Sequence, residues 1–173
     1  CVRVPTGGGK TLLAAHTIGL VRQDWITREY PLALWLVPSD AIRQQTTDAL
    51  KDRRHFYRQA LDEAFGGRVR VFDIEDFDLI RPHDLRDNCC IVVGTVQTLR
   101  VTNTSGRRVY AHNENFEPHF AGVPKDAPGL ERHGNNGVKF SFANLMHMLR
   151  PLLIIDEAHN NTTRLSYEAY ERV

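Results

Sequence analysis

The sequence PTGGGKT at residues 5–11 decides the fold, because it lies between a short apolar stretch and a segment with helical spacing. Val2–Pro5 indicates the end of a strand, and Lys10–Arg22 has apolar residues at helical intervals. Successive glycines let the backbone curl so that its N–H groups point at phosphate oxygens, and the following helix adds the positive end of its dipole. We therefore predict a phosphate-binding loop at this strand-to-helix turn.

The chemistry of the loop residues predicts their roles. Lys10 would reach the β- and γ-phosphates of a nucleotide, and the hydroxyl of Thr11 would ligate Mg²⁺. The strict pattern has glycine where this chain has Val4, but the Gly-Lys-Thr core is intact. A glycine-rich turn with an incidental lysine is the weaker alternative, because the pattern arises by chance in fewer than roughly one in a hundred such chains. The sequence thus predicts ATP and Mg²⁺ as ligands, bound by Thr6, Gly7, Gly8, Gly9, Lys10 and Thr11.

A second motif, Asp156-Glu157-Ala158-His159, directly follows the apolar run Leu152–Ile155. A buried strand that ends in Asp156 delivers a carboxylate to the edge of a sheet, where it can hold Mg²⁺. Glu157 can orient and deprotonate an attacking water. This arrangement suits hydrolysis of a phosphoanhydride, so Lys10, Asp156 and Glu157 are the predicted catalytic residues. A solvated acidic helix start is the alternative, but the apolar run before Asp156 argues against it.

Continuous apolar runs alternate with helical segments along most of the chain. Strands are predicted at Leu32–Val37, Val69–Phe72, Cys89–Val93 and Leu152–Ile155. Helices are predicted at Lys10–Arg22, from the N-cap Ser39 to about Lys51, at Arg53–Phe65 before Gly66 and Gly67, and from Ser141 to Leu149. Apolar strands separated by helices indicate a mostly parallel sheet covered on both faces, hence a three-layer α/β domain with its ligand at the carboxyl ends of the strands.

Length and composition limit the class of protein. The 173 residues correspond to one domain, and 42% hydrophobic with 25% charged residues is ordinary for a globular protein. The net charge of +1 gives no global basic field, so any nucleic-acid contact must come from a local surface. No apolar run approaches the roughly 20 residues that span a bilayer. The adjacent Cys89 and Cys90, with Cys1, form no disulfide framework and predict buried, reduced thiols in a cytoplasmic protein.

Residues 101–140 depart from the alternation of strands and helices. They are rich in Asn, Gly and charge, and only Asn113–Ala121 has room for a helical turn or two. The favoured interpretation is a surface insertion, and the alternative is a contact surface built on Arg107, Arg108 and Tyr110.

The chain also lacks an initiator Met and stops within SYEAYERV, which has the pattern of an unfinished helix. We therefore expect a fragment of a larger protein, with a domain that spans residues 1–173 and is incomplete at both ends.

In its motifs and their order the chain resembles the first RecA-like domain of superfamily-two helicases and translocases. Among these it most resembles the DEAH-type motor subunit of type III restriction enzymes, and the resemblance covers nearly the whole chain. PTGGGKT resembles motif I, and LWLVPSDAIRQQ at 34–45 resembles motif Ia. VVGTVQTL at 92–99 resembles the later nucleic-acid contact motif, and IIDEAHN at 154–160 resembles motif II. The resemblance implies a RecA-like P-loop fold.

The resemblance also implies a function: the ATP-binding half of a nucleic-acid-dependent ATPase, a helicase or translocase from a restriction or DNA-processing enzyme. His159 matches the position that couples the nucleotide site to the second motor domain. Ser39, Arg43, Thr95 and Gln97 fall in the nucleic-acid motifs, where they would contact phosphates and not bases. Helix capping or an ordinary polar surface is the alternative for them, and for Arg43 and Gln97 the two explanations are about even. The implied partners are DNA, or else RNA, a second RecA-like domain, and nuclease or methyltransferase modules.

The 173 residues lack the adenine-reading motif, the motif that follows DEAH, and the second RecA-like domain with its arginine finger. Because an arginine finger contributes about 10³–10⁵ in rate, we expect the isolated chain to bind nucleotide weakly and to hydrolyse it poorly. Two other functions are open: a P-loop ATPase or nucleotide switch that does not act on nucleic acid, and a non-catalytic domain that keeps only the fold. The intact Lys10, Asp156 and Glu157 argue against the last.

Overall fold

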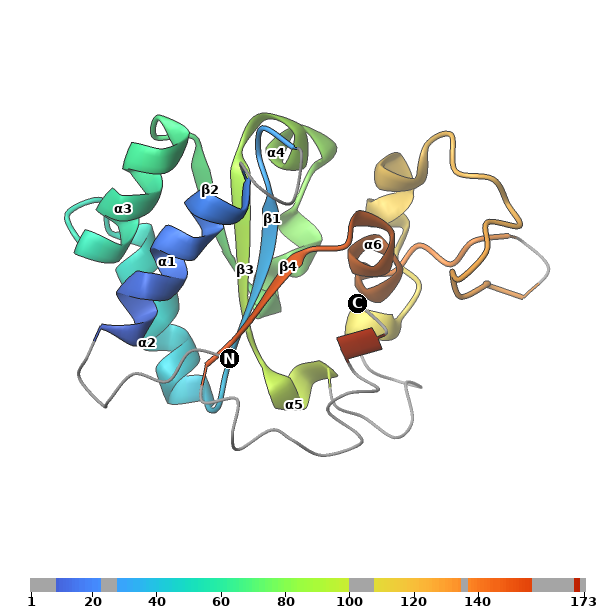
Figure 1. Cartoon of the computed structure of the whole chain (residues 1–173). Coiled ribbons are helices and arrows are strands. Elements are labelled where there is room, and N and C mark those ends of the chain that lie inside the picture. Colours follow the sequence, from blue (N-terminus) through green and yellow to red (C-terminus); the bar gives the residue numbers. More distant parts are fainter. Residues whose placement is uncertain (1–8, 23–27, 100–107, 135–136, 157–169, 172–173) are drawn as a thin grey trace.

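The computed structural model describes residues 9–22, 28–99, 108–134, 137–156 and 170–171. Within them lies a four-stranded sheet in the order β2-β3-β1-β4, and each neighbouring pair of strands is parallel. The strands are β1 (Leu32–Val37), β2 (Val69–Asp73), β3 (Cys89–Thr95) and β4 (Leu152–Ile155). Figure 1 shows helical layers on either side of this sheet. The prediction of a three-layer α/β domain with a parallel sheet is therefore confirmed.

Three helices cover one face of the sheet: α1 (Lys10–Val21), α2 (Asp40–Lys51) and α3 (Phe56–Phe65). Their buried side chains pack against every second residue of the strands, because successive strand residues point to opposite faces. This core contains Ala15 and Ile18 of α1, Leu50 of α2, Leu61 and Phe65 of α3, and Ala33, Trp35, Val37, Ile91 and Val93 of the sheet.

The opposite face is covered by α6 (Phe142–Leu149) and by the 3₁₀ segments η2 (Ile74–Leu79), η3 (Arg108–Tyr110) and η4 (Glu114–Phe120). Two short helices flank β3, with α4 (Pro82–Asp87) before it and α5 (Val96–Leu99) after it. Since both faces are covered, every residue of β1 and β3 is buried, which explains their continuous apolar sequences.

The predicted elements are found with shifts at some ends. β1 and β4 have the predicted bounds, whereas β2 continues to Asp73 and β3 to Thr95, where both strands still pair in register. Helix α3 begins at Phe56 and not at Arg53, because His55 caps it by accepting a 3.3 Å hydrogen bond from the Tyr57 N–H. The predicted strand Val2–Pro5 lies outside the described residues.

The predicted helix caps are present. Ser39 Oγ accepts a hydrogen bond of 3.4 Å from the Ile42 N–H at the start of α2. Ser141 Oγ accepts one of 3.2 Å from the Asn144 N–H at the start of α6. Each hydroxyl satisfies a backbone donor that the helix itself leaves unpaired, so these caps fix where the helices begin.

The described part of residues 101–140 lies only partly on the surface: residues 121–134 include no buried residue, whereas the residues on either side of them contribute to the core. Val109, Tyr110, Phe116, Phe120 and Val138 are buried in the core beneath α6. η4 occupies the stretch in which a helical turn was expected, and its N-cap Asn113 accepts a 3.0 Å hydrogen bond from the Asn115 N–H. Arg107 lies outside the described residues.

The buried side chain of Asn144 in α6 holds the last part of this segment. Its Oδ1 accepts a hydrogen bond of 3.0 Å from the Glu131 N–H. Its Nδ2 donates to the carbonyl oxygens of Glu131 and Lys139, both at 2.8 Å. Because one amide pairs with three backbone groups, Asn144 ties α6 to this segment, whose own backbone pairing is a short antiparallel bridge between Arg132 and Val138.

Candidate functional site

The carboxyl ends of the described strands meet at one edge of the sheet. The register places Val37 of β1 beside Thr95 of β3, Val93 beside Asp73 of β2, and Leu36 beside Ile155 of β4. Ligands of parallel α/β sheets bind at this edge. The residues that follow each strand are therefore the first candidates for a functional site.

Helix α1 points its first turn toward this edge. At its other end, Arg22 Nη1 donates a 2.9 Å hydrogen bond to the carbonyl oxygen of Ala64, close to the amino end of β2. The 12 residues of α1 span about 18 Å, roughly the length of a strand. Lys10 and Thr11 accordingly lie toward the carboxyl ends of the strands, and Figure 1 shows α1 starting at that end of the domain.

The start of α1 fits an anion. Gly9, its N-cap, has a φ of 78°, a left-handed conformation that favours glycine, and a Cβ there would meet nothing within 4 Å. Gly9 offers no capping side chain, and the first turn contains no acidic residue, whereas Ser39 and Ser141 cap α2 and α6. The positive end of the α1 dipole therefore meets no carboxylate of its own first turn, and Lys10 adds a full positive charge.

Asp156 is placed by the ladder between β4 and β1. Its backbone N–H donates a hydrogen bond of 2.8 Å to the carbonyl oxygen of Leu36. The structure thus brings Lys10, Thr11 and Asp156 to the same edge of the sheet. The other predicted nucleotide-site residues lie outside the described residues: Thr6, Gly7, Gly8, Glu157 and His159.

The oxygen groups at this edge suit Mg²⁺, which needs only one or two ligands from the protein. Within the described ranges there is no group of three or more His, Cys, Asp or Glu side chains able to hold a metal ion. Mg²⁺ is commonly held by one or two carboxylates together with phosphate oxygens and water. The Thr11 hydroxyl and the Asp156 carboxylate are the described groups that would hold such an ion.

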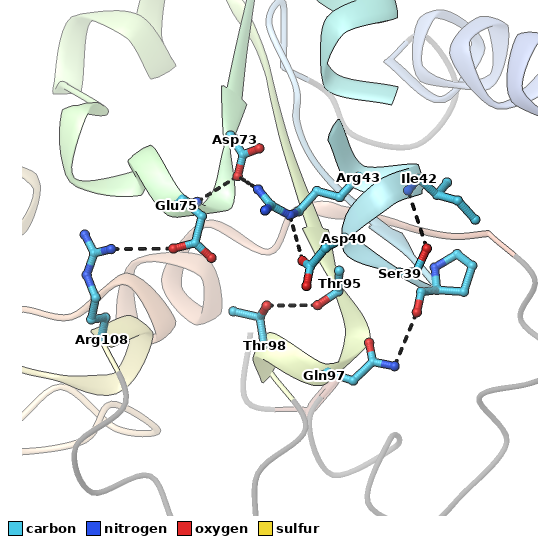
Figure 2. A network of polar contacts seen from close by, with 11 residues as sticks. Ser39, Asp40, Ile42, Arg43, Asp73, Glu75, Thr95, Gln97, Thr98 and Arg108 are labelled. Atoms are coloured by element: carbon cyan, nitrogen blue, oxygen red, sulfur yellow. Dashed lines mark hydrogen bonds and ion pairs between the residues drawn. The ribbon is translucent and has the colours of Figure 1, made fainter. Parts of the chain in front are cut away.

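The four predicted nucleic-acid residues lie at the same edge, around the ends of β1 and β3 (Figure 2). Gln97 Nε2 donates a 3.3 Å hydrogen bond to the carbonyl oxygen of Pro38, which joins the start of α5 to the turn after β1. Thr95 Oγ1 lies 3.0 Å from Thr98 Oγ1 and is engaged in that hydrogen bond. Because Thr95 is only 4% exposed, Thr98 is better placed than Thr95 to face a ligand.

Arg43 is the residue whose surroundings differ most from the prediction. Its Nε donates to Asp40 Oδ1 at 3.1 Å, and its Nη1 pairs with Asp73 Oδ1 at the end of β2. Burial alone would lower the pKa of Arg43, but the hydrogen bonds and charges of the two aspartates outweigh burial and raise the pKa above its ordinary value. Sequence reasoning missed Asp73, although this aspartate directly follows the predicted strand Val69–Phe72.

The described helices include none that is long and apolar enough to cross a bilayer. A parallel sheet flanked by helices, with a glycine-started helix and a strand-terminal aspartate at one edge, has the architecture of a RecA-like domain. The family model described as "Type III restriction enzyme, res subunit" matches residues 1–173. The chain therefore belongs to the family of type III restriction enzyme res subunits. The comparisons with curated proteins and with solved structures gave no match.

Proposed function

We propose that this chain is the ATP-binding part of a nucleic-acid-dependent ATPase, a helicase or translocase that acts on DNA in a restriction or related DNA-processing enzyme. The observation that carries the proposal is the meeting of two motifs at one edge of the sheet. Helix α1 begins there at Gly9 and Lys10, and β4 ends there at Asp156. The family of the chain supports the same function.

The residues suit the hydrolysis of a phosphoanhydride. The N–H groups at the start of α1 and the Lys10 ammonium would hold the phosphates. Thr11 and Asp156 would hold Mg²⁺, which supplies positive charge at the oxygens that gain negative charge. Glu157, the residue after Asp156 in the sequence, would orient the attacking water. Catalysis of this kind depends mainly on positioning and charge, which the fixed edge of a sheet can provide.

The nucleic acid would run along the ends of β1 and β3. Ser39, Gln97 and Thr98 lie there and carry neutral hydrogen-bonding groups. Such groups bind backbone phosphates and fix the register of the protein without reading the bases. DNA is the proposed substrate and RNA the alternative. Because the family acts in restriction, a second RecA-like domain and nuclease or methyltransferase modules are proposed partners, and the cytoplasm is the proposed location.

A P-loop ATPase or nucleotide switch that ignores nucleic acid is the second candidate, because the nucleotide site alone is compatible with it. The rate of ATP hydrolysis by the full-length protein distinguishes the two functions. It is measured without nucleic acid and with duplex DNA, single-stranded DNA or RNA. We expect DNA to raise the rate at least about tenfold. A rate that none of the three nucleic acids changes would support the second candidate and overturn the first.

A further inference from the structure

The guanidinium group of Arg43 is committed to two carboxylates of the protein. Arg43 lies in the first turns of α2 and bridges Asp40 in the same helix and Asp73 at the end of β2 (Figure 2). Only 13% of its side chain is exposed. A phosphate contact needs donors that face solvent, so this geometry is that of a link within the protein.

Asp73 connects three elements through one carboxylate oxygen. Its Oδ1 accepts from Arg43 and also accepts a 2.9 Å hydrogen bond from the Glu75 N–H, which caps η2. The side chain is 10% exposed, so a neutral group in place of Arg43 would leave a shielded negative charge without its cation. The end of β2, the start of η2 and the first turns of α2 are therefore held together at this point.

The surroundings of this link are unfavourable for phosphate. Arg108, the other guanidinium in Figure 2, lies 3.6 Å from Glu75 and 4.0 Å from Asp78. The link and its neighbours thus combine two guanidinium groups with four carboxylates, those of Asp40, Asp73, Glu75 and Asp78. Asp73, Glu75 and Asp78 make the β2–η2 side of the edge negative. Ser39, Gln97 and Thr98 on the β1–β3 side are neutral, and the carboxylate next to Ser39, that of Asp40, is paired with Arg43.

We propose that Asp73 and Arg43 form a positioning pair for the nucleic-acid interface, in which Arg43 does not contact phosphate. The pair fixes the start of α2, and hence Ser39 and the Pro38 carbonyl that binds Gln97, against the end of β2. The nucleic-acid backbone meets the β1–β3 side of the edge. This inference rests on the proposed function.

The test is binding of mixed-sequence duplex DNA to the full-length protein across a range of salt concentrations, measured by fluorescence anisotropy. Arg43→Gln alone should weaken binding about fivefold or more, because it leaves Asp73 unpaired. Adding Asp73→Asn restores the net charge and removes the unpaired carboxylate, so the double variant should bind within about twofold of the unmodified protein. Its salt slope should be unchanged, because no phosphate contact is lost.

Arg43→Lys is the second variant, because it keeps the positive charge but loses the planar fork that joins Asp40 to Asp73. A positioning role predicts weaker binding by this variant, whereas a phosphate contact tolerates lysine. Arg86→Gln is the charge-matched control, since Arg86 is exposed and pairs with Asp87 before the amino end of β3.

The results distinguish a failure of the positioning role from a failure of the proposed function. If the double variant stays as weak as Arg43→Gln and its salt slope falls by about 0.9, Arg43 contacts a phosphate and the positioning role is wrong. If the unmodified protein binds no DNA at any salt concentration, the proposed function fails and the positioning role fails with it.

Discussion

The backbone N–H of Asp156 donates a 2.8 Å hydrogen bond to the carbonyl oxygen of Leu36, one residue beyond the last register pair of β4 and β1. Leu36 is fully buried and belongs to β1, which has a strand on either side. The backbone that carries the Asp156 carboxylate is therefore fixed by the parallel ladder itself. This explains why a four-residue apolar strand directly before the acidic motif is needed.

Asp156→Asn should impair the use of Mg²⁺ without disturbing the fold, because asparagine keeps the backbone hydrogen bond to Leu36 and loses the negative charge. ATP hydrolysis by the full-length protein at saturating ATP should fall about 10²-fold or more. A Mg²⁺ titration of the rate, with thermal unfolding as the check on folding, measures this effect. An unchanged Mg²⁺ dependence would show that Asp156 is not a metal ligand.

Gly19→Ala should separate α1 from α3, because an added Cβ would lie 2.9 Å from the Ala64 Cβ. Overpacking of this kind costs about 1–3 kcal/mol, against a gain of about 1 kcal/mol in helix propensity. A double-mutant cycle with Ala64→Gly, measured by urea unfolding, isolates the contact. We expect Ala64→Gly to rescue Gly19→Ala by about 1 kcal/mol, and simple additivity would contradict the close approach.

Asn144→Leu should loosen the segment beneath α6, because it leaves the Glu131 N–H and the Lys139 C=O without their partner and removes one of the two hydrogen bonds that the Glu131 C=O accepts. A lost partner costs about 1–3 kcal/mol for each buried group, and since these groups are partly buried we expect about 2 kcal/mol in total. The free energy of unfolding in urea measures the loss. The control Asn115→Leu alters an exposed side chain and should stay within about 0.5 kcal/mol.

Cys89 and Cys90 are both buried, as the sequence predicted. Burial, with the nearby Cys90, raises the pKa of Cys89 well above its usual range, and burial together with Asp84 raises the pKa of Cys90 to about 12. Cys90 Sγ also donates to the Asp84 carbonyl oxygen at 3.2 Å, which requires the protonated thiol. We therefore expect iodoacetamide at about pH 8 to leave both residues unmodified in the native protein and to modify them after unfolding.

The same shift predicts a pH dependence of stability. The unfolded chain releases these protons near pH 8.5, whereas the folded protein keeps them until much higher pH. The free energy of unfolding should therefore fall as pH rises from about 8.5 toward 12. In the Cys90→Ala variant, the free energy of unfolding from urea titrations should decrease less over this pH range. An identical pH profile in the variant would show that the Cys90 thiol does not contribute to the decrease.

Much of the fold could be predicted because its signals are local. The continuous apolar runs at Leu32–Val37 and Leu152–Ile155 have the bounds of β1 and β4, and the serine hydroxyls at 39 and 141 mark helix starts. In contrast, η2 and α4 have no helical period that could reveal them. The buried residues Val109, Phe116 and Phe120 follow no regular spacing either, so their place in the core depends on contacts with distant elements.

The candidate site also contains residues that local sequence predicts and residues that only distant contacts bring together. Lys10, Thr11 and Asp156 come from motifs whose position at the ends of a strand or helix is local information. The contact between Arg43 and Asp73 cannot be predicted from local sequence, because 30 residues separate them. Only the pairing of β2 with β3 brings the end of β2 close to α2. The sequence could name Arg43 as a candidate, but only the structure shows what its guanidinium group binds.

The most direct test of the account is DNA-stimulated ATP hydrolysis by the full-length protein, compared with its Lys10→Ala variant. Lys10 begins α1 at the carboxyl edge of the sheet, where its charge would stabilise the transferred phosphoryl group. We predict that DNA stimulates hydrolysis by the unmodified protein and that Lys10→Ala, in a protein that remains folded, lowers the stimulated rate about 10²-fold or more. Hydrolysis at the unmodified rate by a folded Lys10→Ala protein would contradict the claim that this edge is the ATP site.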